Sequence, residues 1–454
     1  MRLVVACLSV LALACGSSSK GGSDAPAGAD GSNSNGGDAG GGDSSSGGGG
    51  TTINVTLNNR PMNAAMFTFL VAYQDGSSAW QLAGAPTNDT YSFHVNAPSW
   101  GVLWTCIGAG GGATNLGQIR QVTEVHFAVA ERTSLTMDVP PRCTDRAPAT
   151  VALTGTLANR SGGGLWVVDF GGRTGIVNGS TGAYRIEAVP GTNDVVARHL
   201  ANGGGTTGDF ATVETVVDRA VTITGATTHD IDASNAVATT SLAVNVVLPQ
   251  QGRGAASTIL YTAGGTTSTL DKLSQNFESD VLDQTQRVTG DVYDQQISVT
   301  SAGQTAIVTN ATATPTDQTF TAPPPLGGAA SAVTATTPYP IVHTTWNAYA
   351  NTIGYAWTAT QTPPPATCGN TPCTIVWGAA LSPGVTGASP GYTMPDLSGL
   401  PGWSNGLAFA TGTQVVGYAE AGTSSAGASD FPPVTPPAAG TQRTFVRSDF
   451  TVTP

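Results

Sequence analysis

The sequence predicts an all-β protein in which three to four β-sandwich domains follow a disordered N-terminal tether. From residue 51 onward, runs rich in Val, Thr, Ile and aromatic residues alternate with polar residues and end at Gly, Pro, Asn or Asp. A short motif recurs, as TLNNR at 56–60 and TLANR at 156–160. Residues 16–50 contain no aromatic and no large aliphatic side chain, so they cannot bury a core.

The first 14 residues are typical of an export signal. Arg2 precedes an apolar run from Leu3 to Ala14, and this run is shorter than the about 20 residues that span a bilayer. It ends at Cys15, with Ala14 before it and Gly16 after it. This junction resembles the type II signal peptide of bacterial lipoproteins. An ordinary secretory signal with a cysteine nearby is the alternative.

The lipoprotein resemblance implies a location and a membrane partner. Residues 1–14 would be removed, Cys15 would carry the lipid, and residues 15–50 would tether the body to the membrane. Because Gly16 follows the cysteine where Asp would favour the inner membrane, we expect the outer membrane, with the protein facing the periplasm or the cell exterior.

The β-rich part divides into four ranges, which we call modules 1 to 4: residues 51–146, 147–238, 239–326 and 327–454. The repeated motif opens modules 1 and 2, and VVLPQ at 246–250 lies at a similar point of module 3. A second predicted strand follows each, as FTFLVAY at 67–73, LWVVDF at 165–170 and STILY at 257–261. A shared strand order with a period near 90 to 100 residues favours β-sandwiches in tandem, as in immunoglobulin-like domains.

Residues 179–199 of module 2 carry a more specific likeness. The segment resembles the transthyretin-like, carboxypeptidase-regulatory type of sandwich, through Gly182, Tyr184, Ile186, Val189, Pro190 and Gly191. The resemblance implies a small seven-stranded domain that acts as a spacer or binding module and has no catalytic residues.

One short helix is expected inside module 3, near 269–283. Leu270, Leu273, Phe277 and Val281 are spaced three or four residues apart, as on one face of a helix, and Ser268 or Thr269 is able to cap its start.

Four cysteines lie in the modules, which predicts disulfides in an exported chain. Cys106 and Cys143 would close part of module 1, and Cys368 and Cys373 would close the short CGNTPC loop. A metal site or a redox pair is the alternative, but four residues separate the thiols of CGNTPC where a redox motif has two.

Composition and motif spacing exclude several classes of function. The formal net charge is −12 and no basic stretch occurs, so nucleic acid is not an expected partner. The five histidines show no metal-binding spacing, and GASPG at 387–391 contains Pro390 directly after Ser389, which favours a turn over a nucleophile elbow. We therefore expect no enzyme, no metal and no cofactor.

Tryptophans are the remaining candidates for a binding site. Trp80, Trp100, Trp104 and Trp403 lie near predicted turns, where indole rings can stack on sugar rings. Core packing is the alternative for each of them. The sequence thus predicts a non-enzymatic envelope spacer, scaffold or adhesion protein that contacts an envelope protein. A glycan-binding module for surface or cell-wall polysaccharide is the alternative.

Overall fold

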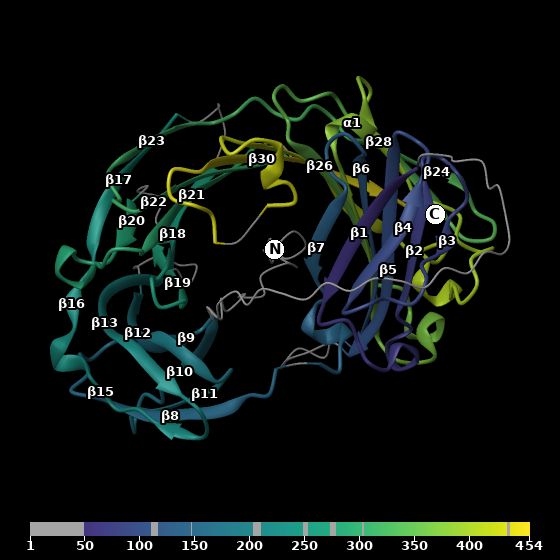
Figure 1. Cartoon of the computed structure of the whole chain (residues 1–454). Coiled ribbons are helices and arrows are strands. Elements are labelled where there is room, and N and C mark those ends of the chain that lie inside the picture. The colour runs from purple at the N-terminus through teal and green to yellow at the C-terminus, as the bar shows by residue number, and fades with distance from the viewer. Residues whose placement is uncertain are drawn as a thin grey trace, which may run out of the picture.

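The computed structural model describes residues 50–109, 117–146, 148–202, 210–247, 253–272, 278–301, 304–433 and 436–454. The predicted signal peptide, Cys15 and the tether lie outside these residues. The regular secondary structure of the described chain is almost entirely β-strand, and the chain forms an open arch (Figure 1). The all-β prediction is therefore confirmed.

Modules 1, 2 and 3 each contain a small sheet with the same topology. Its central strand ends at or near the repeated sequence motif: β1 Thr51–Asn58, β8 Val151–Ala158 and β17 Thr240–Val247. The antiparallel neighbours of these strands are β4 Thr90–Val95, β11 Ala183–Ala188 and β20 Glu278–Val281. Their parallel neighbours are β7 Ser134–Asp138, then β14 Thr227–Thr228 with β15 Ile231–Asp232, and β23 Gln318–Thr321.

Module 4 has a different small sheet. Its central strand, β25 Ile341–Thr345, is antiparallel to both β24 Ala330–Ala335 and β28 Gly391–Thr393. Module 4 therefore departs from the topology that the first three modules share.

A single long sheet, which we call the shared sheet, runs through all four modules. Each strand hydrogen-bonds to the next in the order module 2, module 3, module 4, module 1. Its strands, in that spatial order, are β10 Arg173–Ile176, β9 Leu165–Phe170, β12 Gly191–Asn202, β13 Phe210–Ile223, β19 Thr267–Lys272, β18 Arg253–Tyr261, β21 Val292–Ser301, β22 Gln304–Thr312, β30 Gln442–Val452, β29 Val415–Ser424, β26 Gly354–Gln361, β27 Cys373–Leu381, β6 Gln118–Ala128, β5 Ser99–Ala109, β2 Leu70–Asp75 and β3 Gln81–Leu82; β16 Val237–Ala238 also pairs with β13.

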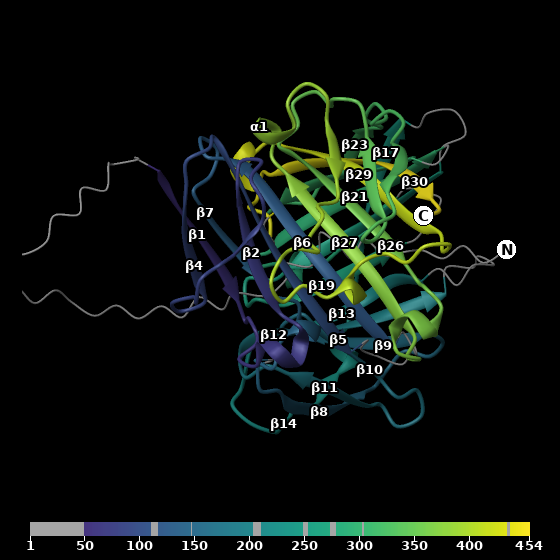
Figure 2. The ribbon, with the colours of Figure 1, turned by 90° about the vertical axis from the view of Figure 1, so that its right-hand side faces the viewer.

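The joint between modules 4 and 1 is a parallel pair of strands. β27 runs beside β6 from the pair Cys373–Gln118 to the pair Leu381–His126. Figure 2 shows β6, β27 and β26 side by side. Modules 1 and 2 are neighbours in sequence, yet they lie at opposite ends of the shared sheet.

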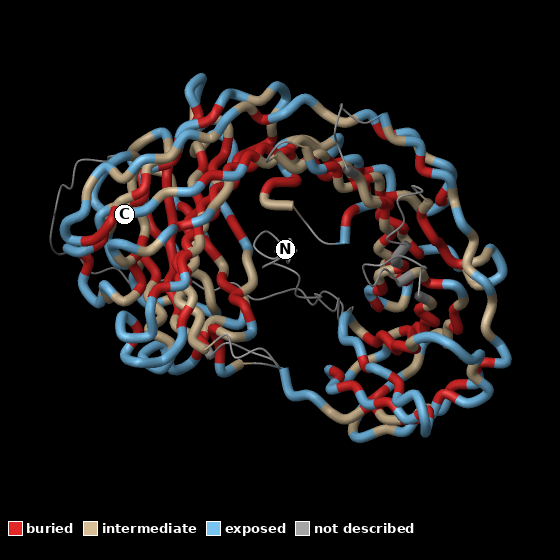
Figure 3. The backbone as a smooth tube through the Cα atoms, turned by 180° about the vertical axis from the view of Figure 1, so that it is seen from behind, coloured by how far each residue is buried: buried red, intermediate tan, exposed pale blue. Residues whose placement is uncertain are grey.

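The hydrophobic cores follow the shared sheet and cross the module limits. Buried residues gather between it and the small sheets (Figure 3). Leu103 and Val122 of module 1 belong to the core cluster that contains Trp377 of module 4. In the opposite direction, Phe431 of module 4 packs on Phe127 of module 1, with ring centroids 6.1 Å apart. Modules 1 and 4 therefore form one packed body.

The helix predicted near 269–283 is wrong wherever the structure describes this segment. Residues up to 272 belong to β19 and residues from 278 belong to β20, while Leu273 and Phe277 lie outside the described residues. Leu270 and Val281 do share a core, but from two strands and not from one helical face. The described helical elements are elsewhere: α1 Pro383–Thr386 and the 3-10 turns η2 Ala64–Phe67, η3 Pro141–Cys143, η4 Ala233–Asn235, η5 Gln284–Gln286, η6 Pro365–Cys368, η7 Asn405–Leu407 and η8 Ala428–Asp430.

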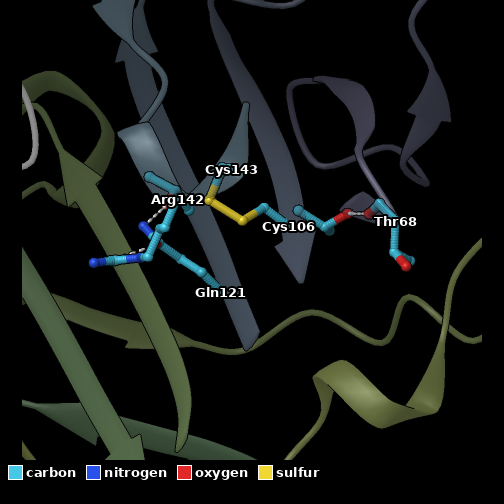
Figure 4. The surroundings of a disulfide bond; sticks show 7 residues. Thr68, Cys106, Gln121, Arg142 and Cys143 are labelled. Carbon is cyan, nitrogen blue, oxygen red and sulfur yellow. Dashed lines mark hydrogen bonds between the residues drawn. A yellow bond between two sulfur atoms is a disulfide. The ribbon is translucent and has the colours of Figure 1, made fainter. Parts of the chain in front are cut away.

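Both predicted disulfides are present. Cys106 of β5 is bonded to Cys143 of η3, with their Cα atoms 5.7 Å apart. Beside this bond, Arg142 donates to Oε1 of Gln121 at 2.7 Å (Figure 4). The second bond joins Cys368 to Cys373, the residue at which β27 begins. The first bond therefore lies within module 1 and the second within module 4, and neither crosses the joint between them.

No helix among the described residues has the length and apolar character needed to cross a membrane.

Candidate functional site

A cleft of about 350 Å³ lies where modules 1 and 4 meet, which we call the Trp80 cleft. Its volume falls within the range of about 300–1,000 Å³ that is usual for ligand sites. One wall is the turn between β2 and β3, and the other is the loop after β28. The lining residues are Gln74, Ser77, Ser78, Ala79, Trp80, Pro395, Asp396, Gly399 and Leu400.

Hydrogen bonds fix the module 1 wall of the cleft. The carboxylate of Asp75 accepts from the backbone N–H groups of Asn96 and Ala97, and the side-chain amide of Gln74 donates to the carbonyl oxygen of Ser78 at 2.7 Å. Gly76 has a φ of +59°, a conformation that favours glycine in a tight turn. Trp80 is thus held on an ordered turn, and its ring is partly exposed.

The module 4 wall is fixed by a buried phenol. Tyr339 donates from its hydroxyl to the carbonyl oxygen of Pro395 at 2.9 Å and accepts from the N–H of Leu397 at 2.6 Å. Burial raises the pKa of Tyr339, so the hydroxyl keeps its proton and remains a donor. Asp396, which lies between these two residues, accepts from the N–H of Ser398 at 2.9 Å.

Behind Trp80, two residues of β6 form a buried network. His126 meets the Trp80 ring edge-on at 5.7 Å between centroids, and its Nε2 lies 3.1 Å from Oε2 of Glu124. Oε1 of Glu124 accepts from the indole N–H of Trp377 at 2.8 Å and from the hydroxyl of Tyr392 at 2.7 Å. Burial and the charge of Glu124 raise the pKa of Tyr392, which therefore stays protonated and donates.

This network was not predicted, although the sequence contains a signal for it. In VTEVHFAV at 122–129, Glu124 and His126 lie on the same face of the strand, between the apolar residues Val122 and Ala128. A carboxylate that is buried at such a position needs several hydrogen-bond donors. Here Trp377, Tyr392 and His126 surround it.

Two of the four predicted tryptophans lie at the cleft or beside it. Trp80 lines it. Trp403 packs behind the opposite wall, with its ring centroid 5.8 Å from that of Tyr339 and 5.9 Å from that of Trp377. Both are only partly buried against the same core cluster.

Trp100 and Trp104 take the alternative, core packing. Both lie in β5, Trp100 as its second residue after the turn from β4, and both point into the core, with exposures of 1% and 3%. The indole N–H of Trp100 donates to the carbonyl oxygen of Arg132 at 2.7 Å. Trp104 borders a narrow pocket of about 60 Å³, which is small for a ligand site. Alternation along β5 turns both side chains away from the Trp80 cleft.

The chemistry of the Trp80 cleft suits a neutral, hydroxyl-rich molecule. An indole face offers apolar contact to the C–H side of a sugar ring, while Asp396, Gln74 and the two serines offer hydrogen-bond partners. No cationic side chain is among the residues that line it. The carboxylate of Asp396 would repel an acidic sugar.

Module 2 contains a serine, a histidine and a carboxylate in contact, as a catalytic triad does. Ser161 Oγ and Glu214 Oε1 both contact Nδ1 of His199, at 3.0 Å and 2.9 Å, and Ser161 also donates to Glu214. A nucleophilic triad needs the serine and the carboxylate on opposite ring nitrogens. Since both share Nδ1, this trio does not activate Ser161.

Neither a metal site nor a nucleophile elbow is found in the described part of the chain. It contains no group of three or more His, Cys, Asp or Glu side chains placed to hold a metal ion. Ser389 lies in an exposed turn between α1 and β28, without the strand–turn–helix that a nucleophile elbow requires.

No protein-family model and no curated protein matches the chain. Among solved structures, the chain is similar to the product complex of a multi-modular glycogen-degrading pneumococcal virulence factor, SpuA, at 11% identity and a TM-score of 0.13. The match covers 57% of this chain and 37% of that one, so this chain spans well under half the length of that protein. Similarity at this level supports no conclusion about the fold or function of this chain.

Proposed function

We propose that the protein is a non-enzymatic scaffold of the cell envelope, held to the outer membrane by a lipid on Cys15. The observation that carries the proposal is the shared sheet, which joins the four modules by strand pairing. Domains connected only by linkers usually move relative to one another. Here, by contrast, the β6–β27 ladder and the mixed core of modules 1 and 4 make a body of fixed shape.

Fractionation of cells that express the wild type or Cys15→Ser tests the anchor. We expect the wild type in the outer-membrane fraction and the Ser variant in the soluble fraction. Protease treatment of intact cells then distinguishes a body that faces the exterior, which is cleaved, from one that faces the periplasm, which is protected. A Ser variant that stays in the membrane fraction would contradict the lipid anchor.

A second candidate function, carbohydrate binding, is favoured by the geometry of the Trp80 cleft. Trp80 is a partly exposed indole on a fixed turn, and the polar groups of the opposite module face it across a volume that admits a sugar ring. Because Asp396 is the charged residue of the lining, we propose neutral polysaccharides as the ligand class.

Retention of the full chain carrying Cys15→Ser on a panel of neutral and acidic polysaccharides tests this function. We expect Trp80→Ala to weaken binding by about tenfold or more, because stacking and apolar burial are both lost. Leu82→Ala is the matched control, since Leu82 is 44% exposed on the next strand of the same hairpin and does not line the cleft. Equal retention of wild type and Trp80→Ala, or preference for acidic polysaccharides, would contradict the proposal.

A further inference from the structure

Module 2 contains a second pocket, of about 390 Å³, at the turn between β8 and β9. Arg160 is the charged residue among those that line it, and none of them carries a carboxylate. The lining residues are Leu157, Ala158, Asn159, Arg160, Ser161, Gly162, Gly163, Gly164, Leu165, Trp166, Val177, Gly179 and Thr181. We call it the Arg160 pocket.

The internal repeat shows what is unusual about Arg160. Its counterpart in module 1 is Arg60, the last residue of TLNNR, as Arg160 is of TLANR. Nε of Arg60 forms an ion pair with Asp89 at 2.9 Å, and Asp89 also pairs with Arg146 at 2.7 Å. The module 1 arginine is therefore paired with a carboxylate of its own module.

In module 2, glycine replaces the acidic partner. The N–H of Leu57 bonds to the carbonyl oxygen of Asp89, and the N–H of Leu157 makes the same bond to Gly182. The two positions are therefore equivalent, and both have positive φ, +65° at Asp89 and +76° at Gly182. A Cβ on Gly182 would lie 2.7 Å from the carbonyl oxygen of Leu157 and 3.3 Å from the guanidinium carbon of Arg160, so an aspartate there would shift the backbone slightly and would lie beside Arg160.

Arg160 consequently forms no ion pair with any residue that the structure describes. Its Nη1 donates to the carbonyl oxygen of Asn178 at 2.8 Å, which holds the side chain at the pocket wall. A guanidinium has five N–H groups, so donors remain for a ligand.

A second residue of the lining serves as a probe of the pocket. Trp166 lines it and is 4% exposed, and its indole N–H has no hydrogen-bond partner among the described residues. Because this nitrogen is buried from solvent, it reports on changes at the pocket wall without itself contacting a ligand. Nearby carboxylates are already engaged: Glu214 accepts from Ser161, and Asp232 accepts from Asn159.

The glycine run above Trp166 leaves the backbone accessible. A Cβ on Gly162 or Gly163 would meet no atom within 4 Å, so packing does not require glycine at either position. At Gly164, by contrast, a Cβ would lie 2.4 Å from Nε2 of the buried His199, so there the close approach does require glycine. The backbone beside Arg160 is therefore not covered by side chains at Gly162 and Gly163.

From the unpaired guanidinium of Arg160, in a lining without carboxylates and beside an uncovered glycine backbone, we infer that the Arg160 pocket binds a small oxoanion, the carboxylate, sulfate or phosphate group of a ligand. Arginine and backbone N–H groups are the usual partners of such groups. The site is independent of the Trp80 cleft, which lies in modules 1 and 4, and the inference does not rest on carbohydrate binding there.

Titration of the full chain carrying Cys15→Ser, followed by the ¹H–¹⁵N signals of the tryptophan indoles, tests the site. Trp166→Phe identifies the Trp166 signal by its loss. Sodium sulfate, phosphate and acetate are the ligands, and sodium chloride at equal ionic strength is the control. We expect a saturable shift of the Trp166 signal with at least one oxoanion and not with chloride, and the responding salt identifies the group.

Two variants remove the proposed site in different ways. Arg160→Gln removes the charge, and Gly182→Asp restores the acidic partner that module 1 has. Each should weaken binding by about tenfold or more, the loss expected for one charged hydrogen-bond partner. Arg185→Gln is the matched control, because Arg185 lies on the same module, is 64% exposed and pairs with Glu187.

Thermal unfolding confirms that each variant is folded before its titration is read. A Trp166 signal that moves linearly with salt, responds equally to chloride, or responds equally in wild type and Gly182→Asp would overturn the inference. Loss of binding in Arg160→Gln and Gly182→Asp with retention in Arg185→Gln would establish it, whatever the outcome at Trp80.

Discussion

The indole N–H of Trp377 donates to Oε1 of Glu124 at 2.8 Å, joining residues 253 positions apart in the chain. One lies on β27 and the other on β6, the two parallel strands at which module 4 meets module 1. The same carboxylate oxygen accepts from Tyr392, and the other oxygen contacts His126 beneath Trp80. A single buried carboxylate therefore connects the joint between two modules with the histidine that packs behind Trp80.

Removing this carboxylate should destabilise the joint. Glu124→Ala leaves the buried Trp377 N–H and Tyr392 hydroxyl without their acceptor, and we expect the free energy of unfolding to fall by about 3–5 kcal/mol. Urea denaturation measures the loss. Glu187→Ala, whose side chain is 55% exposed, is the control and should change the free energy by less than about 1 kcal/mol. A loss at Glu124 no larger than at Glu187 would disprove the role of the network.

Gly101 should control the position of Trp80 without touching a ligand. A Cβ there would lie 2.7 Å from Nδ1 of His126 and 3.2 Å from the Trp80 ring. We expect Gly101→Ala to displace both rings and reduce polysaccharide retention several-fold. Gly84→Ala is the matched control, because a Cβ at that position meets no atom within 4 Å. Unchanged retention in Gly101→Ala would mean that the His126–Trp80 contact does not set the cleft geometry.

The two disulfides should contribute unequally to stability. Cys106–Cys143 spans 37 residues and Cys368–Cys373 spans 5. The loop-entropy relation gives about 4 kcal/mol for the first and about 2 kcal/mol for the second. Paired Cys→Ala variants, compared by urea denaturation, measure each contribution. A larger loss of stability on removing Cys368–Cys373 than on removing Cys106–Cys143 would show that local strain or packing outweighs loop entropy here.

Asp194 should make the joint between modules 2 and 3 sensitive to acid. Burial alone would raise its pKa, but hydrogen bonds from the N–H of Ala220 at 2.9 Å and from Arg219 at 2.8 Å lower the pKa below the ordinary value of 3.8. Arg219 also pairs with Asp291 of module 3.

Because the folded-state pKa of Asp194 is lowered, its stabilisation is present above pH 3.8 and is lost as the pH falls through the folded-state value. Asp194→Asn should therefore lower the free energy of unfolding by about 2–3 kcal/mol at pH 7, and the difference from wild type should shrink below pH 3.8. Urea denaturation between pH 7 and pH 3 measures it. A difference that grows on acidification would contradict the assignment.

Much of the local structure could be predicted from sequence patterns. LWVVDF became β9 over the predicted range, and the TLNNR and TLANR motifs end the central strands β1 and β8. The helix in module 3 was mispredicted because the three- and four-residue spacing of Leu270 to Val281 also fits two strands that face one core. β19 forms a ladder with β18, from Lys272 to Thr267, and this long-range pairing outweighs the helical pattern.

The site was only partly predictable. Trp80 and Trp403 lie near turns, as the sequence predicts, and both are partly exposed, but no local signal shows that loops more than 300 residues apart meet at one cleft. Trp100 and Trp104 look the same in sequence, and their burial follows from which face of β5 the small sheet covers. The β6–β27 pairing depends on long-range register, which period-two patterning cannot specify.

The shared sheet makes modules 1 and 4 one body. Amide hydrogen exchange of β6 and β27 tests this rigidity most directly. We predict that the backbone amides of 118–128 and 373–381 are strongly protected and exchange together, at the free energy of global unfolding. Rapid exchange of either strand, or protection that differs between them by several kcal/mol, would show that the modules open independently and would contradict the scaffold.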